Sequence, residues 1–263
     1  MKAGNKLTSQ ILHAPNLNEF ELHLQQADDQ TLAVFDIDEV IFTSKDQVLN
    51  PNYKIHRDRL EKKITEQLNI AEQKRLSFLL YKLRLRVIVD PNILSVFDLL
   101  LNNNIKTVAL THCPTGMVGE DNIELVRIDQ LKNFGLDFSK LLPEVKHVDL
   151  SGINIDTNAP QFLQGVILTA MIDKGTVLKE FLKKIAFKPT KILFIDDRME
   201  NLLSVQSMCH DLDIEYVGFE YTAVADIPVL DFNEERANLQ FETLLKENIW
   251  LSDEQATAIL SIR

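Results

Sequence analysis

The chain has 263 residues, of which 45% are hydrophobic and 25% charged, and its formal net charge is −11. This length and composition are typical of one large globular domain, or of a core with a modest insertion. The acidic balance argues against a general nucleic-acid surface and against an anionic-membrane surface. Only two cysteines are present, without metal-like spacing, which disfavours a disulfide framework or a zinc site.

The start of the chain, MKAGNKLTSQ, contains no apolar segment that resembles a signal peptide. No apolar run reaches the roughly 18 residues that span a membrane. We therefore expect a cytoplasmic protein without a membrane or nucleic-acid partner. A secreted or periplasmic location is the alternative if a leader has been removed.

The hydrophobic pattern predicts strands that alternate with amphipathic helices. Such an alternation is typical of an α/β fold with a mostly parallel sheet flanked by helices. The expected elements are, in chain order, a helix at 16–27, a strand at 31–37, two helices within 54–86, a helix from 91, a strand at 105–110, a helix at 121–134, a strand at 145–150, a hairpin at 161–170, a helix from 174, a strand at 191–195, a helix at 199–209, a strand at 213–219 and two helices in the tail.

The composition shifts between residues 45 and 90. Residues 54–86 are rich in Lys, Arg, Glu, Gln and Leu and have little β-propensity. Two charged helices here interrupt the alternation of strands and helices. We therefore predict an inserted helical cap over 45–90 and a catalytic core formed by 1–44 and 91–263. The basic residues of the insertion are interpreted as solvated helix faces, with attraction of anionic substrates as the alternative.

Two predicted buried strands each end in a pair of aspartates. The strand TLAVF runs directly into Asp36 and Asp38, and the strand ILFI runs into Asp196 and Asp197. Open α/β sheets place their sites at the carboxyl ends of their strands, so we expect these four side chains to meet. A lone Asp-x-Asp pair is a weak signal, because paired acids often end strands or cap helices. Two such strand ends in one chain make a stronger one.

These residue types suit phosphoryl transfer to an aspartate. Asp36 is the candidate nucleophile, and Asp38 is the candidate acid that protonates the leaving alcohol and then deprotonates water. Thr111 ends the adjacent predicted strand and offers a hydroxyl to the phosphate. Lys174, at a predicted helix start, offers a positive charge, although a lone lysine is more often a surface residue.

The remaining candidates support this chemistry. Asp196 and Asp197 offer carboxylates to a Mg²⁺ ion, and Asn201, one turn later, is expected to support them. His112 lies beside Thr111, where it either contacts the substrate or is held by backbone groups.

This set of residues resembles the motifs of the haloacid dehalogenase-like (HAD) superfamily, in the right order over about residues 31–200. The resemblance implies a Rossmannoid core with a helical cap inserted after the first motif. The matching positions are Asp36 to Val40 for the first motif, Thr111 for the second, Lys174 for the third, and Asp196 with Asp197 for the fourth.

Three stretches, LTHCP, QGVILT and FIDDRMENLLSV, more narrowly resemble a bacterial branch of uncharacterised HAD proteins known as DUF2608. Related acid-phosphatase-like members often continue the second motif as T-A-R-P. Here the corresponding residues are Thr111 to Pro114, THCP, and the arginine is missing.

The resemblance also implies roles for individual residues. Asp36 is the implied nucleophile and Asp38 the implied acid/base. The implied Mg²⁺ ligands are Asp36, the backbone carbonyl of Asp38, and the aspartates at 196 and 197.

We therefore expect a Mg²⁺-dependent phosphatase that acts on a small phosphomonoester through an aspartyl-phosphate intermediate. One alternative is a HAD-type phosphotransferase or mutase, and another is a catalytically silent binding protein with the same fold. A phosphatase assay with Mg²⁺ separates an enzyme from a silent protein. Acceptor-dependent product formation separates a transferase from a hydrolase. The sequence determines neither the substrate nor the oligomeric state.

Overall fold

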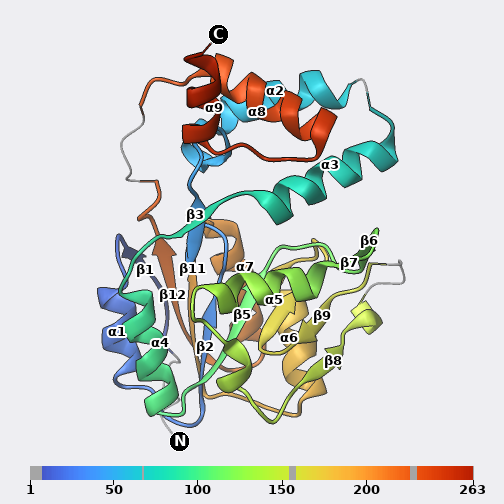
Figure 1. The fold of residues 1–263 in the computed structure, drawn as a ribbon. Coiled ribbons are helices and arrows are strands. Elements are labelled where there is room, and N and C mark those ends of the chain that lie inside the picture. Colours follow the sequence, from blue (N-terminus) through green and yellow to red (C-terminus); the bar gives the residue numbers. More distant parts are fainter. Residues whose placement is uncertain (1–7, 67, 154–157, 226–229, 263) are drawn as a thin grey trace, which may run out of the picture. The chain divides into compact units, whose positions relative to one another are not determined.

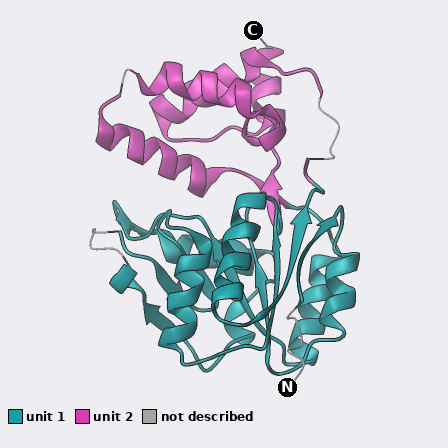
Figure 2. Cartoon of the chain, turned by 180° about the vertical axis from the view of Figure 1, so that it is seen from behind, with its two compact units in different colours: residues 1–41, 88–223 teal, residues 42–87, 224–263 magenta. Residues whose placement is uncertain are grey.

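The chain forms two compact units, as seen in a computed structural model. One unit contains residues 1–41 and 88–223, and the other contains residues 42–87 and 224–263 (Figure 2). Each unit is therefore made of two separate stretches of the sequence. The residues that the structure describes are 8–66, 68–153, 158–225 and 230–262.

The first unit is built on a mainly parallel sheet, with the order β1-β12-β11-β2-β5-β10-β9-β8 in the part of the chain described (Figure 1). Neighbours run parallel from β1 to β10, whereas the last two pairings, with β9 and β8, are antiparallel. The strands are β1 (Ser9–Ala14), β2 (Thr31–Phe35), β5 (Lys106–Thr111), β8 (His147–Asp149), β9 (Gln161–Leu163), β10 (Val166–Leu168), β11 (Lys191–Asp196) and β12 (Glu215–Tyr221).

Helices flank this sheet, which gives the α/β, Rossmann-like core that the sequence predicts. The helices of this unit are α1 (Asn18–Leu24), α4 (Ile93–Asn102), α5 (Ile123–Asn133), α6 (Lys174–Lys184) and α7 (Met199–Asp211). Shorter elements complete it: the hairpin of β6 (Met117–Val118) and β7 (Asp121–Asn122), and the 3-10 turns η3 (Phe138–Lys140) and η4 (Ser151–Ile153).

Alternating side chains of the central strands cover opposite faces of the sheet. Val34 of β2 belongs to the same buried cluster as Val177 of α6 and Val205 of α7. Its neighbour Phe35 points the other way and packs edge-to-face on Phe20 of α1, with ring centroids 4.9 Å apart. Both faces of β2 are therefore buried, which explains why its sequence, TLAVF, is apolar without alternation.

The second unit is helical. Its apolar cluster contains residues from both stretches of the sequence, including Leu60, Leu76, Phe241 and Trp250. The buried carboxylate of Asp46 accepts a hydrogen bond from Trp250 Nε1 at 2.8 Å. The elements of this unit are β3 (Phe42–Ser44), η1 (Gln47–Leu49), η2 (Pro51–Tyr53), α2 (Lys54–Thr65), α3 (Ile70–Leu83), β4 (Arg86–Ile88), α8 (Glu234–Glu247) and α9 (Asp253–Leu260).

The structure divides the chain differently from the predicted boundaries. The insertion covers 42–87 rather than 45–90, and the tail from 224 belongs to the insertion rather than to the core. The amphipathic pattern of the tail predicts its two helices but not their packing partner, which lies far away in the sequence. Five strands, β1, β3, β4, β6 and β7, were not predicted; four of them have only two or three residues, and β1 precedes the first predicted helix. The role of the insertion as a cap stays a prediction.

Candidate functional site

The pairing of β2 with β11 brings the two aspartate pairs together. Phe35 lies opposite Ile195 in this parallel pair, so Asp36 and Asp196 each follow directly after the same paired position. The N–H of Asp36 donates to the carbonyl of Ile195 at 2.9 Å, which extends the pairing by one step. Both carboxyl side chains are buried, Asp36 at 6% exposure and Asp196 at 0%. A site with two adjacent buried acids therefore lies at the carboxyl edge of the sheet.

Lys174 is placed at this edge by the start of α6. The side chain of Asp173 caps the helix and accepts a hydrogen bond from the N–H of Thr176 at 2.9 Å. Gly175 lets the helix approach α7 closely, since a Cβ at this position would lie 2.5 Å from the carbonyl oxygen of Ser204. The Lys-Gly sequence thus combines a buried cation with the close packing that positions it.

The ammonium group of Lys174 is fully buried between two acids. Its Nζ lies 2.9 Å from Oδ1 of Asp36 and 2.7 Å from Oδ2 of Asp196. Burial alone lowers the pKa of Lys174, but the two carboxylates outweigh it and the pKa lies above its ordinary value. Burial also raises the pKa of Asp36 well above its ordinary value; Lys174 opposes this rise, while Asp196 and Asp197 add to it. Lys174 is therefore the permanent positive charge of the site.

Protein donors occupy both oxygens of the Asp196 carboxylate. Oδ1 accepts from the N–H of Arg198 and from Nδ2 of Asn201, both at 2.9 Å. Oδ2 accepts from Lys174 at 2.7 Å and from the same Asn201 nitrogen at 3.1 Å. Asn201, on α7, thus donates to both oxygens of Asp196. Asp196 holds the lysine and the asparagine in place.

Asp197 differs from its neighbour because it is only partly buried. Burial, together with the nearby charges of Asp196 and Glu39, raises the pKa of Asp197 to about 7. Within the described residues, oxygens of Asp36, Asp196 and Asp197 lie within 4.8 Å of one another. When all three carboxylates are ionised, their negative charge exceeds the positive charge of Lys174 by two. Such an all-oxygen set with this charge fits a Mg²⁺ ion. A ligand role for the backbone carbonyl of Asp38 stays a prediction.

The carboxylate of Asp38 pairs with an arginine that the sequence analysis missed. Arg127, on α5, donates from Nη1 to Oδ1 at 3.2 Å and from Nη2 to Oδ2 at 2.6 Å. The arginine is 1% exposed and the aspartate side chain 30%. One signal was present in the sequence: Arg127 lies four residues after Ile123 and four before Leu131, on the apolar face of its helix. A charged residue on such a face indicates a buried partner.

Thr111 lies at the end of β5, beside the aspartates. β5 pairs with β2, with Ala109 opposite Phe35, and pairs on its other side with β10, where Leu168 lies opposite Thr111. The carbonyl of Thr111 accepts from the N–H of Thr169 at 3.1 Å, and its side chain is buried. Thr111 is therefore at the expected edge. That Thr111 and Lys174 both contact the substrate phosphate stays a prediction.

His112, the next residue, is partly buried and contacts a side chain rather than the backbone. Its Nδ1 lies 3.1 Å from Oγ1 of Thr169. Burial lowers the pKa of His112, and the positive charges of Lys174 and Arg198 lower it further. This environment favours the neutral ring, which can both donate and accept hydrogen bonds.

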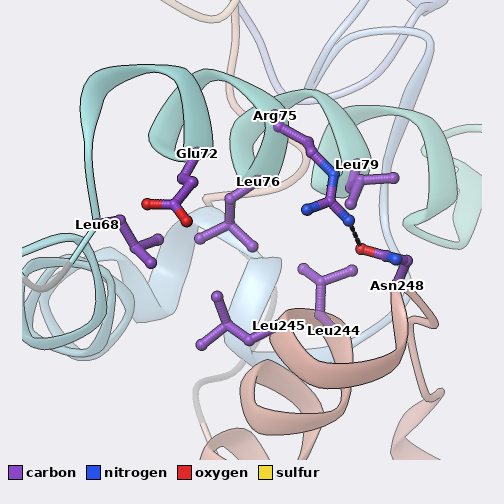
Figure 3. A pocket seen from close by; sticks show the side chains of 8 residues that line it. All are labelled: Leu68, Glu72, Arg75, Leu76, Leu79, Leu244, Leu245 and Asn248. Atoms are coloured by element: carbon purple, nitrogen blue, oxygen red, sulfur yellow. Dashed lines mark hydrogen bonds between the residues drawn. The ribbon is translucent and has the colours of Figure 1, made fainter. Parts of the chain in front are cut away.

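A separate pocket lies within the second unit, between α3 and α8 (Figure 3). Its volume is about 70 Å³, and it is lined by five leucines, at 68, 76, 79, 244 and 245, together with Glu72, Arg75 and Asn248. The side chain of Arg75 donates to Asn248 at one end of it. One acid, Glu72, lines the pocket, and its carboxylate accepts a hydrogen bond from the N–H of Asn69 as part of a helix cap.

The sequence matches the family described as "Protein of unknown function (DUF2608)" over residues 13–257. The chain therefore belongs to the DUF2608 family, as the three short stretches predict. No solved structure matches the chain. Among the described residues, no helix is long and apolar enough to cross a membrane.

The chain is similar to proteins of Rickettsia and Chlamydia. An uncharacterized protein of Rickettsia prowazekii, RP296, is 26% identical over 247 residues, which cover 90% of this chain and 86% of the relative. A putative outer membrane protein of Chlamydia muridarum is 33% identical over 98 residues, covering 37% of this chain and 34% of the relative. Another, of Chlamydia pneumoniae, is 24% identical over 247 residues, covering 90% and 86%.

Proposed function

We propose that this DUF2608 protein is a Mg²⁺-dependent phosphatase that hydrolyses a small phosphomonoester through an aspartyl-phosphate on Asp36. The observation that carries the proposal is the buried triad in which Lys174 lies between Asp36 and Asp196 at 2.9 and 2.7 Å. A carboxylate held beside a fixed cation, at the edge of a divalent-metal site, suits attack on a phosphoryl group. The resemblance to the HAD superfamily is part of this proposal.

In the first step, a carboxylate oxygen of Asp36 attacks phosphorus and the bond to the leaving oxygen breaks. Oδ1 of Asp36 accepts from the N–H of Ile37 at 2.7 Å and from Lys174 at 2.9 Å. Because these two donors both engage Oδ1, Oδ2 is the proposed nucleophile. The leaving alkoxide takes a proton from Asp38 and departs as the alcohol.

In the second step, Asp38 removes a proton from water and the resulting hydroxide attacks the same phosphorus. The bond between phosphorus and Asp36 breaks, which releases inorganic phosphate and restores the carboxylate. Lys174 offsets negative charge in both steps. The hydroxyl of Thr111 and the ring of His112 are the proposed contacts for the phosphoryl oxygens.

The proposed Mg²⁺ ligands are the carboxylates of Asp36 and Asp197, together with the backbone carbonyl of Asp38. A bound Mg²⁺ screens the repulsion between the attacking carboxylate and the phosphate. Asp196 already accepts four hydrogen bonds from protein groups. Its main proposed role is therefore to position Lys174 next to the nucleophile.

A panel of phosphomonoesters, assayed for phosphate release with Mg²⁺, tests this function. We expect turnover of at least one substrate, its loss on chelation and its return when Mg²⁺ is added back. Asp36→Asn, assayed in parallel, should be inactive. Product that forms only when an alcohol acceptor is added would favour the phosphotransferase alternative. A folded protein that binds phosphomonoesters without turnover would favour the silent binding protein.

The names of the chlamydial relatives bear on location. Four of them are called putative outer membrane proteins, which supports export as the alternative to a cytoplasmic location. The proposed chemistry needs only Mg²⁺ and water and is compatible with either compartment. Fractionation of cells that express the full-length gene from its own start, followed by immunoblotting, distinguishes the two locations.

A further inference from the structure

The proposed chemistry gives Asp38 two proton transfers but does not explain what fixes its carboxylate. A general base has to lie within hydrogen-bond reach of its water and in the right orientation. Asp38 follows the end of β2 and is partly exposed, with 30% of its side chain accessible. A carboxylate in such a position needs an additional contact to hold one orientation.

Arg127 provides this contact in a two-point geometry. The two guanidinium nitrogens each donate to a different oxygen of Asp38, at 3.2 and 2.6 Å. Such a fork fixes the plane of the carboxylate as well as its distance. Each carboxylate oxygen has two lone pairs, and the fork uses one on each oxygen.

The side chain of Arg127 is itself buried. It is 1% exposed and among the largest fully buried side chains of the described chain. One turn earlier on the same face of α5, Glu124 is also buried, and its Oε1 accepts from the N–H of Gly116 at 2.9 Å. Gly116 belongs to the loop that follows Thr111. The inner face of α5 thus contacts both segments that leave the carboxyl ends of β2 and β5.

We propose that Arg127 is a positioning residue that acts through Asp38 and fixes its carboxylate for attack of water on the phosphorylated enzyme. This inference rests on the proposed function. Displacement of a catalytic group by about 1 Å can lower a rate on the order of a hundredfold. Loss of the fork should therefore slow breakdown of the phosphoenzyme more than it weakens substrate binding.

A double-mutant cycle on phosphoenzyme breakdown tests the inference. The enzyme is labelled with ³²P-acetyl phosphate and Mg²⁺, and loss of the label from protein is followed after a chase. We expect Arg127→Met to slow the loss by about tenfold to a hundredfold, and Asp38→Ala to slow it by at least as much. The variant with both changes should match Asp38→Ala within about twofold, because the arginine acts only through the aspartate. KM for a phosphomonoester should change little.

A control and a second variant keep the result interpretable. Arg59→Met removes the same charge from an exposed ion pair with Glu234 and should leave the decay rate unchanged. If Arg127→Met does not fold, the same cycle is run with Arg127→Lys, which keeps the charge but not the fork. If the effects of the single changes at Arg127 and Asp38 multiply in the double variant, the inference is overturned. This holds for either substitution of Arg127.

The proposed function has its own readout in the same experiment. If the wild-type protein takes up no label, or if Asp36→Asn takes up as much label as wild type, the proposed function fails. If labelling requires Asp36 but the effects of the changes at Arg127 and Asp38 multiply, only the role assigned to Arg127 is refuted.

Discussion

The candidate site has a buried floor and an accessible rim, which differ in how their charges are balanced. The floor consists of Asp36, Lys174 and Asp196, which are 6%, 0% and 0% exposed and which pair with one another. The rim consists of Asp38, His112 and Asp197, which are all partly buried. Protein partners fix the floor, whereas burial and neighbouring acidic charges raise the pKa of Asp197 in the rim. The floor is therefore built into the fold, and the rim is where an added cation, water and substrate are expected to act.

The largest expected effect is on the floor, at the nucleophile. Asp36→Asn should lower turnover by about four powers of ten or more, because an amide is not a competent nucleophile. The free energy of unfolding should stay equal or rise, since one buried negative charge is removed from a crowded set. Steady-state assays and urea denaturation measure the two quantities. Asp211→Asn, at a site 59% exposed, is a matched control that should change neither. Retained turnover would rule out the aspartyl-phosphate route.

Lys174→Met should damage both activity and stability. It leaves Asp36 and Asp196 buried without their cation, which typically costs about 3–5 kcal/mol of folding free energy. Turnover should fall by about a hundredfold to a thousandfold. Lys179→Met, on the same helix and 49% exposed, should have little effect on either quantity. If both variants unfold at the same urea concentration, the floor does not have the structural role described here.

The rim predicts a pH dependence of stability in chelated protein. The pKa of Asp197 rises on folding from 3.8 to about 7, so the folded state binds a proton that the unfolded state has already lost. The contribution of Asp197 to the free energy of unfolding should therefore be most favourable below about pH 4 and decline as pH rises toward 7. The slope should be at most about 1.4 kcal/mol per pH unit from this residue. Urea denaturation in EDTA across this range measures it. Asp197→Asn should remove this part of the slope, and an unchanged slope would contradict the assignment.

The smallest expected effect is at Thr111, where two substitutions separate the role of the hydroxyl from that of the methyl group. Thr111→Ser keeps the hydroxyl and should lower kcat/KM by less than about threefold, whereas Thr111→Ala should lower it by about tenfold or more. Stability should fall modestly in both variants, because the side chain is buried. Equal losses of activity in the two variants would show that the hydroxyl does not contact the substrate.

Local sequence patterns predict the floor well, because its parts are carried by strand ends and a helix start. Asp36 and Asp196 each follow an apolar run, and Lys174 begins an amphipathic helix. A parallel sheet then brings such strand ends together. The register that places the aspartates side by side could not be derived from either run alone.

Contacts between distant segments were beyond the reach of such patterns. The pair of Asp38 and Arg127 joins residues 89 apart in the sequence, and neither neighbourhood identifies the other partner. The tail helices were predicted as elements, yet their packing with residues 42–87 depends on long-range burial of apolar side chains such as Phe241. Position on a helix face shows that a residue is buried, but not against which segment.

The discontinuous second unit has a consequence for synthesis of the protein. Asp46 and Trp250, which share a buried hydrogen bond, are 204 residues apart in the chain. At translation rates of about 5–20 residues per second, Asp46 is synthesised roughly 10 to 40 s before Trp250. During that interval apolar residues such as Leu60 and Leu76 lack the tail that covers them in the finished protein. The nascent chain should therefore depend on chaperones up to its last helix, and residues 42–87 expressed alone should aggregate.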